Sequence, residues 1–371
     1  MDSYKKTILH ILEGSGIEIN GPNTWDMQVH NEKLYQRILR SGSLGLGEAY
    51  IEGWWDCGEL EEFFFRAFRA DLEQRIMNNF TTYFQIAKAS ILNLQTKIKS
   101  LEVAKIHYDA GNDLYKSMLD KWMMYSCAYW ENASTLDEAQ EHKLDLICRK
   151  LKLSPGLRVL DIGCGWGGLA KYAAEKYNVS VTGITISMEQ AKLAVENCHD
   201  LPVDIRIQDY RDMHEKFDRI VSVGMFEHVG YKNYDKFMAA VSGLLEDEGI
   251  FLLHTIGGNE PVKNTDPWIN KYIFPNSMIP SPEQICKAIS GKFRIEDWHN
   301  FGRHYYLTIM AWLQNFERNW PQLSKKYNAQ FYRMWKFYLC SSAATFRARK
   351  NNLWQIVFSK ENSLADYASV R

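Results

Sequence analysis

The stretch VLDIGCGWGG, residues 159–168, decides how the rest of this 371-residue sequence is interpreted. It begins as an apolar strand that ends near Asp161 and continues as a loop with Gly163, Gly165 and Gly168. Glycines at such a place let the backbone approach a ligand closely, while the N-terminus of the next helix faces that ligand. The spacing G-x-G-x-x-G between a strand and a helix therefore indicates a site for a nucleotide-like cofactor.

Strands alternate with helices beyond this loop. Helices are expected from the loop through Tyr177, over 188–198 and over 234–245, and strands at 158–162, 179–184, 203–208, 219–224 and 249–254. This alternation predicts an α/β fold with a doubly wound, mostly parallel sheet that binds ligands at the carboxyl ends of its strands. The tail is expected to add strands at 294–298 and 353–358 and a helix over 307–320.

Residues 1–100 lack this alternation and are predicted to form a small helical domain. A linker is expected to reach about residue 110, with the catalytic domain over 111–371. From 59 to 98 apolar residues, among them Leu60, Phe63 and Phe64, recur at roughly helical spacing. Two interpretations stay open. The stripe is the core of a helical bundle, or part of it faces lipid together with nearby lysines (Lys88, Lys97 and Lys99).

The composition excludes several classes of protein. A formal net charge of -1 gives no overall attraction to nucleic acid, and no basic stripe with interleaved aromatic residues crosses the catalytic region. The seven cysteines contain no C-x-x-C pair, which argues against a disulfide framework or a zinc site and for a reducing cytoplasm. No stretch is apolar enough to span a bilayer. No metal and no nucleic-acid partner are expected.

Two cofactor classes fit the glycine loop. A dinucleotide would require a carboxylate about 20 residues on, at the end of the second strand; that strand ends with VTGITIS, which offers Thr185 and Ser187 instead. S-adenosylmethionine is favoured, because VLDIGCGWGG resembles the first motif of class I methyltransferases and QDYRD, with Asp209, resembles their adenine-binding segment. Asp161 would then orient the loop or face a cationic ligand, with a structural cap as its alternative role.

Further stretches resemble the cyclopropane-fatty-acyl-phospholipid synthase family, in order and from about residue 10 to the end. They are SLGLGEAYIEGWWDC (43–57), YSCAYW (125–130), TISMEQ (185–190), FDRIVSVGMFEHVG (217–230), FLLHTIG (251–257), DPWINKYIFPN (266–276), EDWHNFG (296–302) and FRAR (346–349).

The resemblance implies an enzyme that uses S-adenosylmethionine to convert a cis double bond of an unsaturated phospholipid acyl chain into a cyclopropane ring. It implies a class I methyltransferase fold preceded by a helical domain that helps to hold lipid, a bicarbonate ion in the active site, and a homodimer. The enzyme would be cytoplasmic and peripherally associated with the inner face of the cell membrane.

The same resemblance implies two sets of site residues. The bicarbonate-binding set is Cys127, Glu227, His254, Ile256 and Tyr305. The donor-binding set is Tyr125, Ser126, Gly163, Cys164, Gly165, Thr185, Gln190, Asp209 and Tyr210, to which Asp161 is added; Gln190 would take over the ribose contacts. One position departs from the family, since Ser342 stands where relatives often carry a cysteine and Cys340 lies two residues earlier. A nucleophilic cysteine is thereby placed in doubt.

Glu227 follows an apolar run that is expected to be a buried strand, where an unpaired carboxylate costs several kcal/mol. Methyl transfer to an alkene leaves a carbocation, so water must be excluded and a base must remove one proton. The hypothesis is that Glu227 accepts the hydrogen of bicarbonate, while His254, Tyr305 and backbone N–H groups near Cys127 and Ile256 donate to it. The alternatives are that Glu227 caps the next helix or pairs with a lysine, and that His254 is a core histidine. His228 is expected to be structural, because neighbouring residues on a strand point to opposite faces.

Two other functions compete with this one. A related enzyme would stop at methylation or add water to the cation, which the bicarbonate set argues against. A catalytically dead lipid-binding protein on the same scaffold would be expected to lose Asp161, the glycines or Glu227, and all of these are present.

Overall fold

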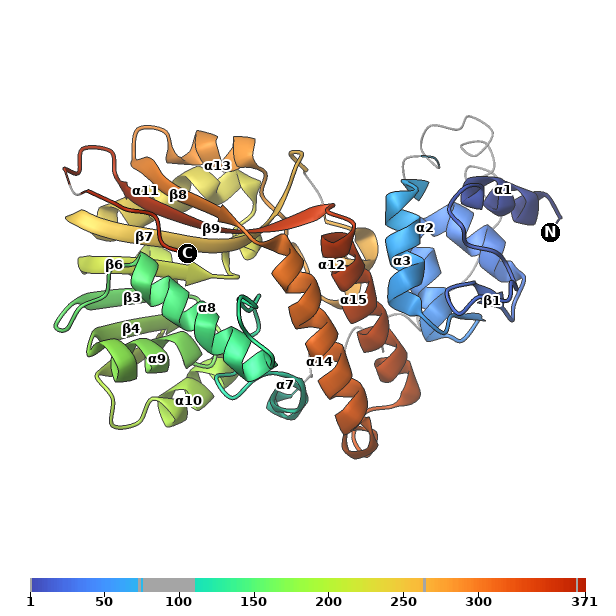
Figure 1. The fold of residues 1–371 in the computed structure, drawn as a ribbon, viewed down its shortest axis with the longest axis horizontal. Coiled ribbons are helices and arrows are strands. Elements are labelled where there is room, and N and C mark those ends of the chain that lie inside the picture. The colour runs from blue at the N-terminus through green and yellow to red at the C-terminus, as the bar shows by residue number, and fades with distance from the viewer. Residues whose placement is uncertain (1, 73–74, 76–110, 263–264, 365) are drawn as a thin grey trace. The chain divides into compact units, whose positions relative to one another are not determined.

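The computed structural model describes residues 2–72, 75, 111–262, 265–364 and 366–371. The chain divides into two compact units (Figure 1). The first, here called the helical unit, comprises Met1–Met118, Thr265–Pro275 and Ile309–Lys350. The second, the sheet unit, comprises Leu119–Asn264, Asn276–Thr308 and Asn351–Arg371.

The sheet unit is built on a seven-stranded sheet of order β5-β4-β3-β6-β7-β9-β8. Its strands are β3 (Arg158–Ile162), β4 (Ser180–Thr185), β5 (Val203–Ile207), β6 (Phe217–Val223), β7 (Leu245–Gly258), β8 (Phe293–Asn300) and β9 (Asn351–Lys360). Strands β3 to β7 pair in parallel, while β9 is antiparallel to both β7 and β8. The predicted α/β fold with a mostly parallel sheet is confirmed, and each predicted strand overlaps an observed one.

Helices cover both faces of this sheet (Figure 1). Helices α8 (Leu136–Lys150) and α9 (Gly168–Tyr177) share one apolar core with it. On the other face, α11 (Tyr234–Leu244) and α13 (Pro282–Ile289) share a second core. Helix α10 (Met188–Asn197) contacts β4 and β5. Because β3 to β7 run parallel, the loops at their carboxyl ends meet at one edge of the sheet.

Two helices that the sequence analysis did not predict have clear starting signals. Thr135 and Glu138 form a reciprocal capping box at the start of α8. Ser281 and Gln284 do the same for α13, with Pro282 in its first turn. Such boxes satisfy backbone N–H groups that have no partner within the helix. Both starts could therefore have been predicted from the sequence.

The helical unit contains a two-stranded ribbon and several helices. These are β1 (Gln28–Val29), β2 (Trp55–Asp56), α1 (Asp2–Leu12), α2 (Lys33–Ile51), α3 (Leu60–Arg69), α7 (Asn112–Met118), α12 (Pro267–Tyr272), α15 (Ala329–Arg347) and the part of α14 (Gly302–Leu323) that follows Thr308. The predicted helix over 307–320 is confirmed as α14, whereas α15 was not predicted. Among the described residues, no helix is both long and apolar enough to cross a membrane.

The described part of the aromatic stripe forms core. Leu60, Phe63 and Phe64 of α3 are buried, and the Phe64 ring lies 4.9 Å from that of Phe337 on α15. The core interpretation is thus confirmed for these three residues. The rest of the stripe from residue 76 onward and the lysines at 88, 97 and 99 lie outside the described residues.

Segments 265–275 and 309–350 pack with the N-terminal residues, although the sequence analysis placed them in the catalytic domain. Glu48 of α2 illustrates this packing, because its carboxylate accepts hydrogen bonds from Lys271 at 2.7 Å and from Tyr272 at 3.0 Å. The assignment of residues 1–100 to a lipid-associating domain stays a prediction.

Candidate active site

The glycine loop between β3 and α9 has one packed end and one open face. The N–H groups of Gly163 and Cys164 both donate to the carbonyl of Ile184, at 2.9 and 3.0 Å. A β-carbon on Gly168 would lie 2.0 Å from the carbonyl oxygen of Trp122, whereas one on Gly165 would meet nothing within 4 Å. Gly165 also has φ +55°, which disfavours other residues. The space over Gly165 is thus open, and a side chain at this position would enter it.

Residues after β4 and β5 lie at the same edge of the sheet. Thr185 ends β4, its hydroxyl donates to the Gln190 side chain at 3.2 Å, and its carbonyl accepts from the N–H of Gln208 at 3.1 Å. Asp209 accepts hydrogen bonds from Arg211, which lower the pKa of its carboxyl group. Tyr210 packs against Phe237. The segment with Tyr125 and Ser126 also lies at this edge of the sheet. A β-carbon on Gly224, just after β6, would lie 3.9 Å from the β-carbon of Ser126.

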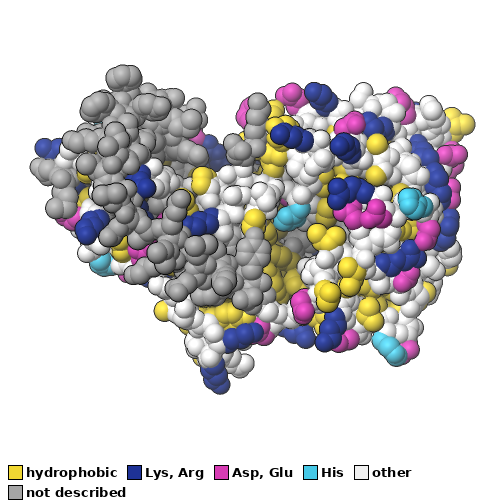
Figure 2. All heavy atoms as spheres, turned by 180° about the vertical axis from the view of Figure 1, so that it is seen from behind, with side chains coloured by type: hydrophobic (Ala, Val, Ile, Leu, Met, Phe, Trp, Pro, Cys, Tyr) yellow, Lys and Arg dark blue, Asp and Glu magenta, His cyan; other side chains and the backbone are white. Residues whose placement is uncertain are grey.

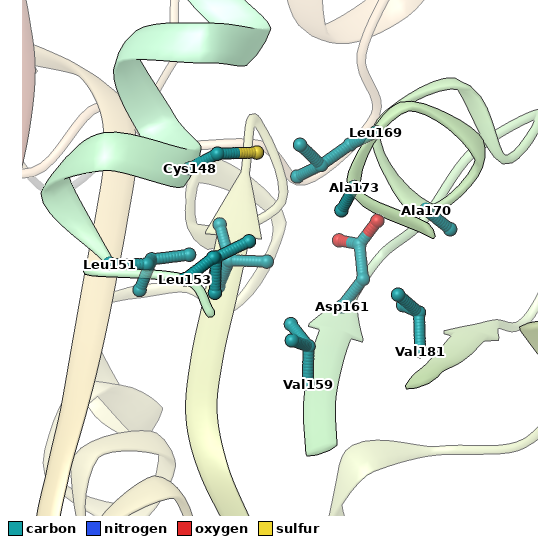
Figure 3. Close-up of a pocket in the computed structure, with 10 residues that line it drawn as sticks. Cys148, Leu151, Leu153, Val159, Asp161, Leu169, Ala170, Ala173 and Val181 are labelled. Carbon is teal, nitrogen blue, oxygen red and sulfur yellow. The ribbon is translucent and has the colours of Figure 1, made fainter. Parts of the chain in front are cut away.

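Asp161 departs from this arrangement. Its carboxyl group points toward Ala173 of α9 (Figure 3), into a small pocket lined mainly by apolar residues such as Leu169 and Val181. Burial raises its pKa to about 7, an effect that the charge of Lys143 opposes. Asp161 therefore lies between the sheet and α9, and its role in donor binding stays a prediction.

The five residues predicted to bind bicarbonate come together in the sheet unit. Cys127, Ile256 and Tyr305 belong to one apolar cluster with Phe301, Leu353 and Tyr129. Glu227 Oε1 accepts a hydrogen bond from the N–H of Ile256 at 2.7 Å, so this N–H, which was predicted to donate to bicarbonate, donates to the carboxylate instead. His254 precedes Ile256 by two residues on β7, so the two side chains share a face, and its ring lies 6.0 Å from that of Phe301.

Glu227 does not lie on a strand, as the apolar run suggested. Strand β6 ends at Val223, and Glu227 lies in the 3-10 turn Phe226–His228. The argument that His228 points away from the site because it follows Glu227 on a strand is therefore wrong, since neither residue lies on a strand. The side chain of His228 is exposed. The carboxylate of Glu227 contacts the backbone of β7 and makes no helix cap in this turn, so the capping alternative is excluded.

Among the five residues predicted to bind bicarbonate, two polar atoms are buried without a hydrogen-bond partner, namely Glu227 Oε2 and His254 Nε2. Burial raises the pKa of Glu227 and lowers the pKa of His254 well below its ordinary value, so the imidazole is neutral. The Gln355 amide donates to Nδ1 of His254 at 3.3 Å, which puts the ring proton on Nε2. A buried acceptor and a buried N–H donor fit a small anion that carries one hydrogen, as bicarbonate does.

Neither cysteine considered for catalysis is activated. Cys127 is fully buried and donates to the carbonyl of Ala128, and burial raises its pKa well above the ordinary value. Burial also raises the pKa of Cys340, which lies in the core of the helical unit. Both are thiols rather than nucleophilic thiolates, which strengthens the doubt about a nucleophilic cysteine.

Four polar residues around the site were not predicted from the sequence, and all of them are buried: Asp120, Gln140, Lys143 and Gln355. Lys143 offered one signal, because it lies on the apolar face of α8 between Ala139 and Ile147. Among the described residues, no group of three or more His, Cys, Asp or Glu side chains could hold a metal ion.

Comparisons with known proteins agree with this geometry. The family model described as mycolic acid cyclopropane synthetase matches residues 95–356. The chain belongs to this family. A cyclopropane-fatty-acyl-phospholipid synthase of Escherichia coli is 52% identical over 98% of this chain and 96% of its own length. A cyclopropane mycolic acid synthase 2 of Mycobacterium leprae is 36% identical over 70% of this chain and 94% of its own.

Solved structures of two cyclopropane synthases share the fold. CmaA1, a mycolic acid cyclopropane synthase solved with SAH and CTAB, has a TM-score of 0.65 and 31% identity, covering 72% of this chain and 99% of its own. MmaA2 of Mycobacterium tuberculosis also has a TM-score of 0.65, with 29% identity over 72% of this chain and all of its own. The predicted family, the class I methyltransferase fold and an enzyme dependent on S-adenosylmethionine are confirmed.

Proposed function

We propose that this enzyme methylates the cis double bond of an unsaturated phospholipid acyl chain and then closes a cyclopropane ring. The double bond attacks the methyl group of S-adenosylmethionine, the bond from carbon to sulfur breaks, and a carbocation remains beside the new methyl. Loss of one proton from that methyl frees the electron pair that forms the ring. The products are a cyclopropane fatty acyl phospholipid and S-adenosylhomocysteine.

One observation carries this proposal: the buried, unpartnered oxygen of Glu227 and nitrogen of His254 belong to groups at the carboxyl edge of the donor-binding sheet. Ring closure requires a base beside the new methyl group, whereas an enzyme that stops at methylation loses the proton from a chain carbon or adds water to the cation. Bicarbonate bound there would supply a small base that accepts the proton from the methyl group.

The chain's own residues orient and protect this site. The Ile256 N–H fixes one oxygen of Glu227, which leaves the other to accept a hydrogen bond. His254, held by Gln355, donates from Nε2, and we assign the phenol of Tyr305 a further donor role. Phe301 and Leu353 are buried beside them and exclude water, which would trap the cation as an alcohol.

The reaction is tested by incubating the enzyme with labelled S-adenosylmethionine and vesicles of an unsaturated phospholipid, followed by mass analysis of the acyl chains. The expected product is heavier than the substrate chain by one CH₂ and lacks the double bond. A methyl-branched alkene would instead mean that the cation loses its proton from a chain carbon and not from the new methyl, and a hydroxylated, methyl-branched chain would mean that water traps the cation; either product would contradict ring closure.

We propose that the enzyme is cytoplasmic, acts as a homodimer and reaches its substrate at the inner face of the membrane. Two cations at the C-terminal end of α15 are paired with carboxylates, because Arg347 binds Glu61 and Glu62 and Lys350 binds Asp71. Lysine and arginine side chains are also interspersed with carboxylates on the face shown in Figure 2. On this face, any attraction to lipid headgroups is therefore local.

Vesicle binding is expected to be stronger on anionic than on zwitterionic phospholipid and to weaken with salt, since the charge contribution is about 1 kcal/mol for each unpaired cation near the surface. Sedimentation of the full chain with both vesicle types at two ionic strengths measures this. The full chain is needed because α3 packs on α15, so removal of residues 1–100 would expose the core of the helical unit. Equal, salt-independent binding to both vesicle types would contradict electrostatic docking.

A further inference from the structure

Helix α8 holds the segment that carries Tyr125, Ser126 and Cys127. Its residues Gln140 and Lys143 are fully buried and lie three positions apart, hence on one face of the helix. The Gln140 amide donates to the Ser126 carbonyl at 2.9 Å, and Lys143 Nζ donates to Ser126 Oγ at 2.9 Å. Both the backbone and the hydroxyl group of Ser126 are thus fixed by α8.

Asp120 holds the same segment from its beginning. Its carboxylate accepts hydrogen bonds from the N–H groups of Trp122 and Met124, at 2.8 and 2.9 Å. Asp120, Asp161 and Cys127 all interact electrostatically with Lys143. The lysine therefore lies close to both predicted sets of residues, since Ser126 belongs to the donor set and Cys127 to the bicarbonate set.

A second buried lysine on the same helix shows how unusual the partner of Lys143 is. Lys150 Nζ lies 3.3 Å from the carboxylate of Asp297, an ordinary buried ion pair. Lys143 instead donates to a hydroxyl group. Burial lowers the pKa of Lys143 to about 8, so it remains mostly protonated at neutral pH. A buried cation favours anions nearby, and the carboxyl groups of Asp120 and Asp161 interact with Lys143 in this way, while its hydrogen bond goes to the neutral hydroxyl group of Ser126.

The hydrogen bond also determines what Ser126 can do. An ammonium group only donates, so Ser126 Oγ must be the acceptor and its own hydrogen is available for another partner. We propose that Lys143 is a positioning residue that holds Ser126 so that its hydroxyl group donates to a carboxylate-type anion. That anion is either the carboxylate in the methionine part of the donor or bicarbonate, so the inference rests on the proposed function.

The test compares wild type with Lys143→Met in the full chain, because methionine is of similar length and tolerates burial. Calorimetry measures binding of S-adenosylhomocysteine and of 5′-methylthioadenosine, which lacks the amino-acid part. If the anion is the donor carboxylate, the variant is expected to bind S-adenosylhomocysteine about tenfold more weakly and 5′-methylthioadenosine as well as wild type. If it is bicarbonate, both affinities stay and half-maximal turnover requires about tenfold more bicarbonate.

Two variants separate positioning from folding. Lys150→Met removes the other buried lysine of α8 and is expected to lower the melting temperature without changing the affinity for S-adenosylhomocysteine. Ser126→Ala is expected to reproduce the ligand effect of Lys143→Met, and the double variant to add little to either, because both remove one interaction. This comparison also covers the case in which Lys143→Met fails to fold.

A folded Lys143→Met or Ser126→Ala protein with wild-type values for both affinities and for the bicarbonate requirement would overturn the inference. Failure of the proposed function would look different, since wild type would then bind S-adenosylhomocysteine yet make no cyclopropane product from vesicles.

Discussion

Glu227→Gln is expected to lower kcat by about 10²–10⁴-fold while the dissociation constant of S-adenosylmethionine changes less than about twofold. Glutamine keeps the size of the side chain and an oxygen that can accept the 2.7 Å hydrogen bond from the Ile256 N–H. It removes the negative charge and replaces one acceptor oxygen by an NH₂ donor. The substitution thus changes the proposed bicarbonate site and leaves the glycine loop, where the donor is proposed to bind, unchanged.

Calorimetry gives the donor affinity, and incorporation of label into lipid gives turnover. Glu246→Gln is a matched control, because Glu246 pairs with Arg158 in an exposed ion pair away from the carboxyl edge. It is expected to keep wild-type turnover. Near-wild-type turnover in Glu227→Gln, in a protein with a normal melting profile, would remove Glu227 from the proton path.

The parallel part of the sheet could be predicted because each strand carries its own local signal. Val159 and Leu160 lie on opposite faces of β3 and are buried in different cores. A strand covered on both faces therefore appears as a continuous apolar run bounded by polar or glycine residues. The ends of the strands were harder to predict. Strand β7 extends to Gly258 because Gly257, which leaves room for the ring of Trp354, does not end it.

The division into units could not be predicted, because it depends on contacts between distant parts of the chain. Nothing local to Phe337 on α15 indicates that its partners are Tyr50 and Phe64. Periodicity identifies the apolar face of a helix but not the element that covers it. The packing of the segments at 265–275 and 309–350 with the N-terminal residues was accordingly not predicted.

The same limit applies to the active site. Family motifs identified Glu227 and His254 from local sequence, and the structure places both against one apolar cluster. Lys143 belongs to no quoted motif, and its contact with Ser126 forms only because α8 packs against the segment around Ser126. Asp161 shows the reverse case, in which a motif residue at the end of β3 points toward α9.

Gly165→Val is expected to weaken binding of S-adenosylmethionine by at least about 100-fold, equivalent to about 2.8 kcal/mol. Two effects combine. A β-branched residue at φ +55° is strained by about 1–3 kcal/mol, which distorts the loop, and its side chain enters the open space over which the donor is proposed to lie. Calorimetry with S-adenosylmethionine and with S-adenosylhomocysteine measures the loss, and turnover should fall with it.

Gly156→Val separates the two effects, because Gly156 also has a positive φ, +87°, and open space around its missing β-carbon. It lies in the turn before β3, at the opposite end of that strand from the glycine loop. The control should lose a similar amount of stability and keep wild-type donor affinity. If Gly165→Val binds the donor as tightly as Gly156→Val does, the space over Gly165 does not hold the donor, and the resemblance of VLDIGCGWGG to the methyltransferase motif would have misplaced the site.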